Sequence, residues 1–212
     1  MCSEFEVDNW IISEFVIKEL VPIVGIHPYP LNELIFMVSA VCRLKPTHIF
    51  EWGTHVGKSA RIFYEITKYF HITSEIHSID LPDNVQHCEH PQQNRGLLVK
   101  NIRDVQLHQG DGITVAIDLY KRINGKPTSL FFLDGDHEYR SVKRELTSIM
   151  KHALHASILI HDTFYQSKQS GYNTGPYKAI RESLRAKSTK YRMLSTNLGL
   201  PGMTLLYIPT LL

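Results

Sequence analysis

The segment from Thr47 to Ala60 constrains the fold more than any other part of the chain. Its sequence is Thr-His-Ile-Phe-Glu-Trp-Gly-Thr-His-Val-Gly-Lys-Ser-Ala, which predicts a short apolar strand over His48–Phe50 followed by a glycine turn. Helical periodicity begins at Lys58 and continues to Tyr69. A strand that leads through a glycine turn into a helix is the first unit of an open α/β sheet, so strands and helices are expected to alternate.

The rest of the chain repeats this alternation and ends in a different pattern. A connection as short as Asn-Leu-Gly-Leu-Pro-Gly joins the last two strands, which predicts an antiparallel hairpin. We therefore expect a mostly parallel seven-stranded sheet with helices on both faces. The other expected strands are Glu75–Ile79, Val105–Gln109, Ser129–Leu133, Ser157–Ile160, Tyr191–Thr196 and Met203–Ile208; the other expected helices are Asp8–Leu20 (broken by Pro22–Pro30), Leu31–Leu44, Gln92–Ile102, one ending at Arg122, Tyr139–His152 and Tyr177–Ala186.

The glycine turn predicts a site for a nucleotide-like ligand. Gly53 and Gly57 lack a Cβ, so a ligand can lie against the backbone, and the free N–H groups of the following helix attract an anion. Glu51 ends the strand, where ligands bind in open α/β sheets. A dinucleotide fingerprint would need glycine at His55 and Lys58. A phosphate-binding P-loop would need one more residue between the two glycines, so both readings fit poorly.

Polar residues follow the other predicted strands. Asp80 ends the second strand, about 20 residues beyond the turn, where an acid can accept hydrogen bonds from ribose hydroxyls. Asp111 follows the third strand, where it can cap the next helix; a place near a bound base is the alternative that the family resemblance given below implies. Acids and imidazoles follow the fourth and fifth strands, and they converge if those strands are neighbours. They are Asp134, Asp136, His137, His161 and Asp162.

Two motifs resemble a known family. Glu51, Gly53, Gly57 and Ser59 match Glu-x-Gly-x-x-x-Gly-x-Ser, which resembles the first motif of class I S-adenosylmethionine-dependent methyltransferases. The match is closest to the catechol O-methyltransferase-like branch. Leu-Asp-Gly-Asp-His-x-Tyr at 133–139, together with His-Asp-Thr at 161–163, resembles metal-dependent and sugar O-methyltransferases related to cephalosporin-hydroxylase-like proteins. The resemblance covers Thr47 to Ile208.

The resemblance implies a Rossmann-like fold and a set of site residues. Residues 1–46 would form a helical cap belonging to the same domain as 47–212, and the linker His27–Pro30 would reach the active site. His161 stands where the metal-dependent O-methyltransferases have an oxygen ligand. Because Mg²⁺ prefers oxygen ligands, Mn²⁺ or Fe²⁺ is expected in preference to Mg²⁺. If no metal binds, His137 is the expected general base. The implied residues are Glu51, Gly53, Thr54, His55, Gly57, Ser59, Asp80, Asp111 and Asp134 for the cofactor, Asp134, Asp136 and His137 for catalysis, and Asp134, His161 and Asp162 for a metal.

The expected function is S-adenosylmethionine-dependent O-methylation of a small molecule or sugar. The alternatives are a P-loop-like nucleotide hydrolase and a non-catalytic S-adenosylmethionine-binding domain. A net charge of +2 gives no case for nucleic acid or membrane partners. Three cysteines, an odd number at unrelated spacings, and the lack of a basic leader predict a cytoplasmic protein. Apolar residues in the helices at 8–44, namely Trp10, Phe15, Leu34 and Phe36, predict a homodimer.

Overall fold

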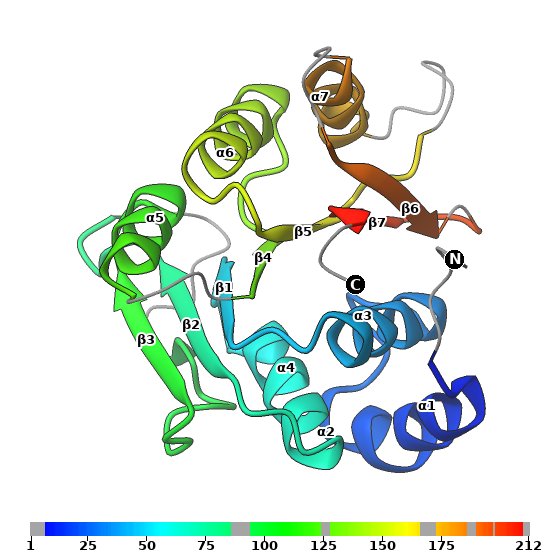
Figure 1. Cartoon of the computed structure of the whole chain (residues 1–212). Coiled ribbons are helices and arrows are strands. Elements are labelled where there is room, and N and C mark those ends of the chain that lie inside the picture. Colours follow the sequence, from blue (N-terminus) through cyan, green and yellow to red (C-terminus); the bar gives the residue numbers. More distant parts are fainter. Residues whose placement is uncertain are drawn as a thin grey trace.

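The chain forms an α/β structure around one sheet (Figure 1). The computed structural model describes residues 7–85, 94–123, 128–165, 173–185, 190–196 and 198–209. Its helical elements are α1 (Asn9–Phe15), η1 (Val16–Leu20), α2 (Val21–Val24), α3 (Leu31–Leu44), α4 (Lys58–Tyr69), α5 (Gly112–Arg122), α6 (Tyr139–His152) and α7 (Gly175–Leu184). Its strands are β1 (His48–Trp52), β2 (Glu75–Asp80), β3 (Val105–Gln109), β4 (Ser129–Leu133), β5 (Ser157–His161), β6 (Arg192–Thr196) and β7 (Met203–Tyr207).

The seven strands lie in the order β3-β2-β1-β4-β5-β7-β6. The first five strands are parallel to one another, and β7 pairs antiparallel with both β5 and β6. The predicted fold class, a mostly parallel sheet with a C-terminal antiparallel hairpin, is therefore confirmed. The order places β4 beside β5, so the residues that follow these two strands lie at the same edge of the sheet.

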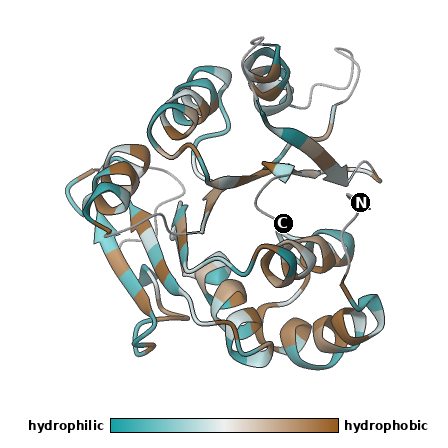
Figure 2. Cartoon of the chain, in the orientation of Figure 1, coloured by the Kyte–Doolittle hydropathy of each residue, from teal (hydrophilic) through white to brown (hydrophobic). Residues whose placement is uncertain are grey.

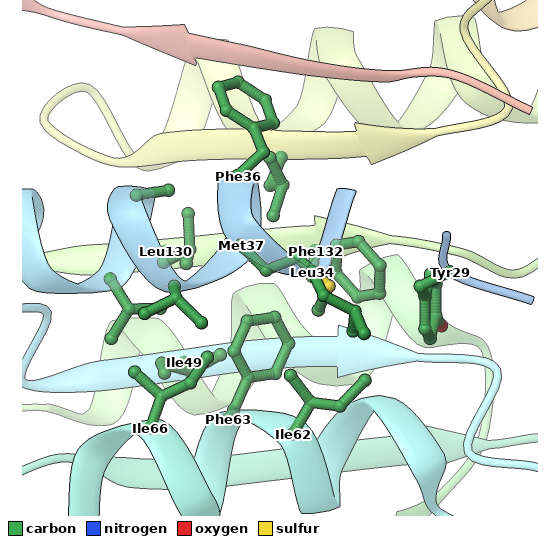
Figure 3. Close-up of a cluster of buried hydrophobic side chains, with 14 of the residues drawn as sticks. Tyr29, Leu34, Phe36, Met37, Ile49, Ile62, Phe63, Ile66, Leu130 and Phe132 are labelled. Carbon is green, nitrogen blue, oxygen red and sulfur yellow. The ribbon is translucent and has the colours of Figure 1, made fainter. Parts of the chain in front are cut away.

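Helices cover both faces of the sheet, and each face has its own apolar core. One core joins α1, α3 and α4 to the sheet and includes Leu34, Phe63 and Phe132 (Figure 3). The other joins α5, α6 and α7 to the opposite face and includes Phe131 and Leu146. Figure 2 shows hydrophilic and hydrophobic residues mixed on the helices, as expected of amphipathic helices that cover a sheet. None of the described helices has the length and apolar character needed to cross a membrane.

The N-terminal helix differs from the prediction at Pro22. Instead of ending at Leu20, the helical path continues to Val24, and the stretch Val16–Leu20 is π-helical. Pro22 lies in the first turn of α2, directly after the π-helical turn. The π-helical turn is wider than a turn of α-helix, and it accommodates the missing backbone N–H of the proline. The path ends at Gly25, whose φ of 69° few other residues adopt.

The prediction of a helix at Gln92–Ile102 is wrong for the residues of this segment that the structure describes. Its first two residues lie outside the described part of the chain, and residues 94–101 form turns. The reason is that the backbone of this segment pairs with the glycine turn: Gly96 N donates to His55 O at 2.8 Å, and Leu98 N donates to Val56 O at 3.0 Å. These contacts replace the hydrogen bonds of a helix, and they brace the turn from outside.

Candidate active site

The predicted site residues lie along the carboxyl edge of the sheet. Glu51, Asp80 and His161 are all within the last two residues of their strands, because β1, β2 and β5 extend one or two residues beyond the predicted ends. Parallel strands bring such ends to the same edge. The site has two parts, the glycine turn after β1 and a cluster of acids and imidazoles after β4 and β5.

Glu51 is fully buried beneath the glycine turn. Ser59 Oγ donates to Glu51 Oε2 at 2.8 Å, whereas Oε1 has no hydrogen-bond partner in the described part of the chain. Burial raises the pKa of the Glu51 carboxyl to about 7, against the opposing effect of hydrogen bonds from Ser78 and Ser59. A buried acid with one unpaired oxygen is suited to a ligand that carries a hydrogen-bond donor or a positive charge.

Asp80 holds the glycine turn against β2. Its carboxylate accepts hydrogen bonds from His55 N at 3.1 Å and from Leu81 N at 2.8 Å. Arg95 Nε lies 3.4 Å from Asp80 Oδ2. Sequence reasoning missed Arg95, because it assigned that residue to a helix. Thr54, also in the turn, is buried and shares a hydrogen bond of 2.6 Å with Ser78.

The two glycines of the turn are required by the packing of the protein itself. The sequence interpretation was that Gly53 leaves room for a ligand, but a Cβ there would lie 2.5 Å from the backbone oxygen of Asp134. Gly57 has a φ of 85°, and a Cβ would lie 2.9 Å from Val99 Cγ2. Gly53 thus allows the turn to approach the loop after β4, so a side chain there would disturb the packing of the protein itself.

Asp111 and Asp136 begin helices. Asp111 is the N-cap of α5, accepts a hydrogen bond from Thr114 N at 3.1 Å, and pairs with Arg144 at 2.6 Å. This is the capping role that the sequence left open. Asp136 is exposed, and it accepts hydrogen bonds from the backbone N of Glu138 at 2.9 Å and from the Ser141 hydroxyl. The structure does not bring Asp136 together with the other predicted catalytic residues.

Asp134, His137, His161 and Asp162 form one cluster, in which each residue has a donor atom within 4.8 Å of the others. His161 Nδ1 lies 2.9 Å from Asp134 Oδ1, and His137 Nε2 lies 3.5 Å from the same oxygen. His137 Nδ1 pairs with Asp162 Oδ2. The expected convergence of the residues after β4 and β5 is confirmed.

Two residues of the N-terminal segment complete this cluster. The Tyr29 hydroxyl donates to Asp134 Oδ2, and its ring contacts the His161 ring at 5.0 Å between centroids. Glu33 on α3 is fully buried; its Oε2 lies 3.0 Å from His161 Nε2, and its Oε1 accepts from Gly202 N at 2.7 Å. The prediction that the linker at 27–30 reaches the site is confirmed. Glu33 was missed, and the signal for it was an acid within an apolar helix.

The cluster balances its charges internally. Burial opposes ionisation of Asp134, but the nearby His161 and His137 outweigh this effect and lower its pKa to about 2. Burial alone would lower the pKa of His137, yet its hydrogen bonds to Asp134 and Asp162 raise it to about 9. The pKa of His161 is raised for the same reason, mainly by Asp134. Carboxylates and imidazoles are also ligands that a borderline divalent cation accepts, so the donor set fits a metal that displaces protons.

The comparisons with known proteins agree with this geometry. Residues 50–163, more than half of the chain, match the family model described as a methyltransferase domain. The chain belongs to this family. The match runs from β1 to the residue after Asp162, so it includes both parts of the site. No related sequence was found among curated proteins.

Solved structures share the fold across most of the chain. An O-methyltransferase from Bacillus cereus in complex with SAH has 14% identity and a TM-score of 0.61, with 93% of this chain and 90% of that chain covered. CalS11, a TDP-rhamnose 3'-O-methyltransferase of calicheamicin biosynthesis, has 15% identity and a TM-score of 0.57, with coverages of 92% and 86%. CmcI with Mg-SAM has 16% identity and a TM-score of 0.54, with coverages of 82% and 71%. These TM-scores establish a common fold, that of Rossmann-like methyltransferases.

Proposed function

We propose that this protein transfers a methyl group from S-adenosylmethionine to a hydroxyl oxygen of a small molecule or sugar. One observation carries the proposal. In a chain of the methyltransferase-domain family, the cluster of Asp134, His137, His161 and Asp162 lies at the same sheet edge as the glycine turn. A non-catalytic binding domain would have no use for four titratable side chains beside its ligand. The names of the structural neighbours from Bacillus cereus and of CalS11 add support for oxygen as the acceptor atom.

The cofactor would lie across the ends of β1 and β2. Asp80, whose carboxylate is oriented by two backbone N–H groups, would accept hydrogen bonds from the ribose hydroxyls. Glu51 Oε1, which is buried and has no hydrogen-bond partner among the described residues, favours the cationic part of S-adenosylmethionine. The amino terminus of α4 at Lys58 supplies free backbone N–H groups for a carboxylate.

The chemistry needs an acceptor hydroxyl that is aligned and loses its proton. Methyl transfer to oxygen is a displacement in which the new C–O bond forms as the bond from carbon to sulfur breaks, so alignment supplies much of the rate. Asp162 orients His137 through Nδ1, and Asp134 Oδ1 lies 3.5 Å from its Nε2. Only the neutral form of His137 would take up the hydroxyl proton, so methyl transfer should rise with pH towards its pKa of about 9. Tyr29 and His161 hold Asp134 in place beside His137.

The same cluster fits a divalent cation. Asp134, His161 and Asp162 would hold it, with His137 as a further donor that the sequence-based set did not include. Such an ion would act as a Lewis acid that lowers the pKa of the acceptor hydroxyl. Because two of the four donors are imidazoles, we propose that Mn²⁺ or Fe²⁺ binds better than Mg²⁺.

Calorimetric titration tests the cofactor assignment. S-adenosylmethionine should bind, whereas ATP, the ligand of the P-loop alternative, should not. Asp80→Asn should weaken S-adenosylmethionine binding by about 1–3 kcal/mol, because it removes a charged acceptor. The matched control is Asp118→Asn, at an exposed position on α5. Equal affinity in the two variants would refute the assignment of Asp80.

Turnover with a panel of sugars and phenols tests the reaction. His137→Gln should bind S-adenosylmethionine as the unchanged protein does but lose methyl transfer by about 100-fold or more, the usual contribution of a general base. If an acceptor is methylated equally well by this variant, His137 is not the base. If the unchanged protein binds the cofactor and methylates nothing, the non-catalytic alternative holds.

A further inference from the structure

A second group of metal-ligating side chains lies at the opposite edge of the sheet, away from the proposed active site. His48 and Glu75 are the first residues of β1 and β2, and the register places them side by side. His77 follows two residues after Glu75, so its side chain is on the same face of the sheet. Each of these three residues has a donor atom within 4.8 Å of the other two.

The hydrogen bonds of the two histidines leave one ring nitrogen of each available. His48 Nδ1 lies 3.0 Å from the Thr47 hydroxyl, and His77 Nδ1 lies 3.2 Å from His108 Nε2. The remaining nitrogen is therefore Nε2 in both residues. The His48 and His77 rings are stacked parallel, with centroids 6.0 Å apart. In metal-bound histidines, one ring nitrogen commonly binds the metal while a neighbouring group fixes the other by a hydrogen bond.

His77 provides the observation that points to a ligand. Its side chain is only 6% exposed, and its Nε2 is buried without a hydrogen-bond partner in the described part of the chain. This atom faces Glu75 Oε2 at 4.0 Å, too far for a hydrogen bond. A buried nitrogen left unpaired is unfavourable, and a metal ion between the two atoms would satisfy it. Glu75 Oε2 also accepts from Gln106 Nε2 at 3.2 Å, a hydrogen bond that a carboxylate oxygen can keep while it binds a metal.

We propose that His48 Nε2, Glu75 Oε2 and His77 Nε2 bind one divalent transition-metal ion of the zinc type. Two imidazoles and one carboxylate are a ligand set that zinc accepts, with a fourth position left to water. Ligands of tetrahedral zinc lie roughly 3.4 Å from one another, since each bond is about 2.1 Å. The side chain of Glu75 is 60% exposed, so it is free to move the short distance required.

The surroundings keep the imidazoles in the form that binds metal. Burial lowers the pKa of His77 to about 4, and it also lowers the pKa of His48 and of His108. All three rings are therefore neutral near pH 7. Since the donors come from two adjacent strands, the ion would join β1 to β2 at their amino ends. The site is separate from the proposed methyl-transfer site, because His48 and Glu75 begin β1 and β2, whereas Glu51 and Asp80 lie at the carboxyl ends of these strands.

Zinc titration of chelator-treated protein tests this proposal. The active-site cluster can also bind metal, so the background protein should carry His137→Gln and Asp162→Asn. We expect one zinc ion per chain by calorimetry, and visible absorption bands of tetrahedral Co²⁺ when cobalt replaces zinc. Thr47→Val, which removes the partner of His48 Nδ1, should weaken zinc binding about 10–100-fold, and His48→Gln or Glu75→Gln should weaken it further.

Controls distinguish loss of the site from loss of the fold. His48 and Glu75 are not fully buried, so both variants should keep the circular dichroism spectrum of the background protein. His155→Gln, at an exposed histidine elsewhere, should leave zinc binding unchanged. Saturating zinc should raise the melting temperature of the background protein but not of the Glu75→Gln variant. Zinc affinity that is equal in the background and in His48→Gln, or no zinc binding in the background, would overturn the proposal.

Discussion

Glu145→Gln should change how the stability of the protein depends on pH. Glu145 lies on α6 with 5% of its surface exposed, and Trp52 Nε1 donates to its Oε1 at 3.0 Å. Trp52 follows Glu51, and a Cβ at Gly112 would lie 2.5 Å from its ring. The acid thus supports a tryptophan that holds the glycine turn and the start of α5 together.

The sign and size of the effect follow from the pKa of Glu145. Burial raises this pKa from 4.5 to about 8, although Trp52 and Arg144 oppose the shift. The folded protein therefore keeps its proton up to about pH 8, whereas the unfolded chain loses it near pH 4.5. The unfolded state binds fewer protons in this window, so the free energy of unfolding falls as pH rises through it. At about 1.4 kcal/mol per pKa unit, the total fall due to Glu145 is about 3–5 kcal/mol.

Urea denaturation followed by circular dichroism measures this effect. Glutamine keeps an oxygen for the Trp52 N–H and has no proton to lose, so the variant should gain stability relative to the unchanged protein as pH rises from about 5 to about 9. The difference between the two curves isolates Glu145 from other titrating groups. Glu138→Gln, at an exposed position where the same helix begins, is the control and should show no such gain. Parallel stability curves for Glu145→Gln and the unchanged protein would refute the reasoning.

Two further predictions concern the site. Gly53→Ala should lower the free energy of unfolding by more than the roughly 1–3 kcal/mol expected for backbone strain, because the new Cβ meets the Asp134 carbonyl. The control is Gly25→Ala, which also has a positive φ but has nothing within 4 Å of the new Cβ, so it should show the strain alone. Equal losses in denaturant melts would contradict this. Asp134→Asn should abolish stimulation by Mn²⁺ or Fe²⁺ while keeping S-adenosylmethionine binding, and chelation should reduce methyl transfer by the unchanged protein. Turnover that is indifferent to chelator would exclude the metal.

Local patterns predicted the sheet and most of the site, because strand ends and glycine spacing are visible in a short window. The residues missed are those whose roles depend on distant contacts. Glu33 is an acid within an apolar helix, but its role depends on His161, which β5 brings against it from 128 residues away. The predicted helix at Gln92–Ile102 failed because its backbone bonds to the glycine turn, which periodicity does not reveal.

The expected homodimer stays a prediction, but the residues that would support it have changed. Phe15, Leu34 and Phe36 are buried in the core of the chain itself, so they are not available to a partner. Trp10 is 89% exposed, and Ile17 on the adjoining turn is 61% exposed. A surface for a second copy would therefore be built on these two residues.

The contacts around Asp134 also set the order in which the site is assembled during synthesis. Tyr29 meets Asp134 across 105 residues of sequence, and Glu33 meets His161 across 128 and Gly202 across 169. Closing such long loops makes these contacts late events in folding. A nascent chain that has emerged only as far as α7 already contains Glu51, Asp80 and the four residues of the cluster, yet Glu33 lacks the backbone N–H of Gly202. The ribosome must therefore deliver residues as far as Gly202 before the site reaches its final form.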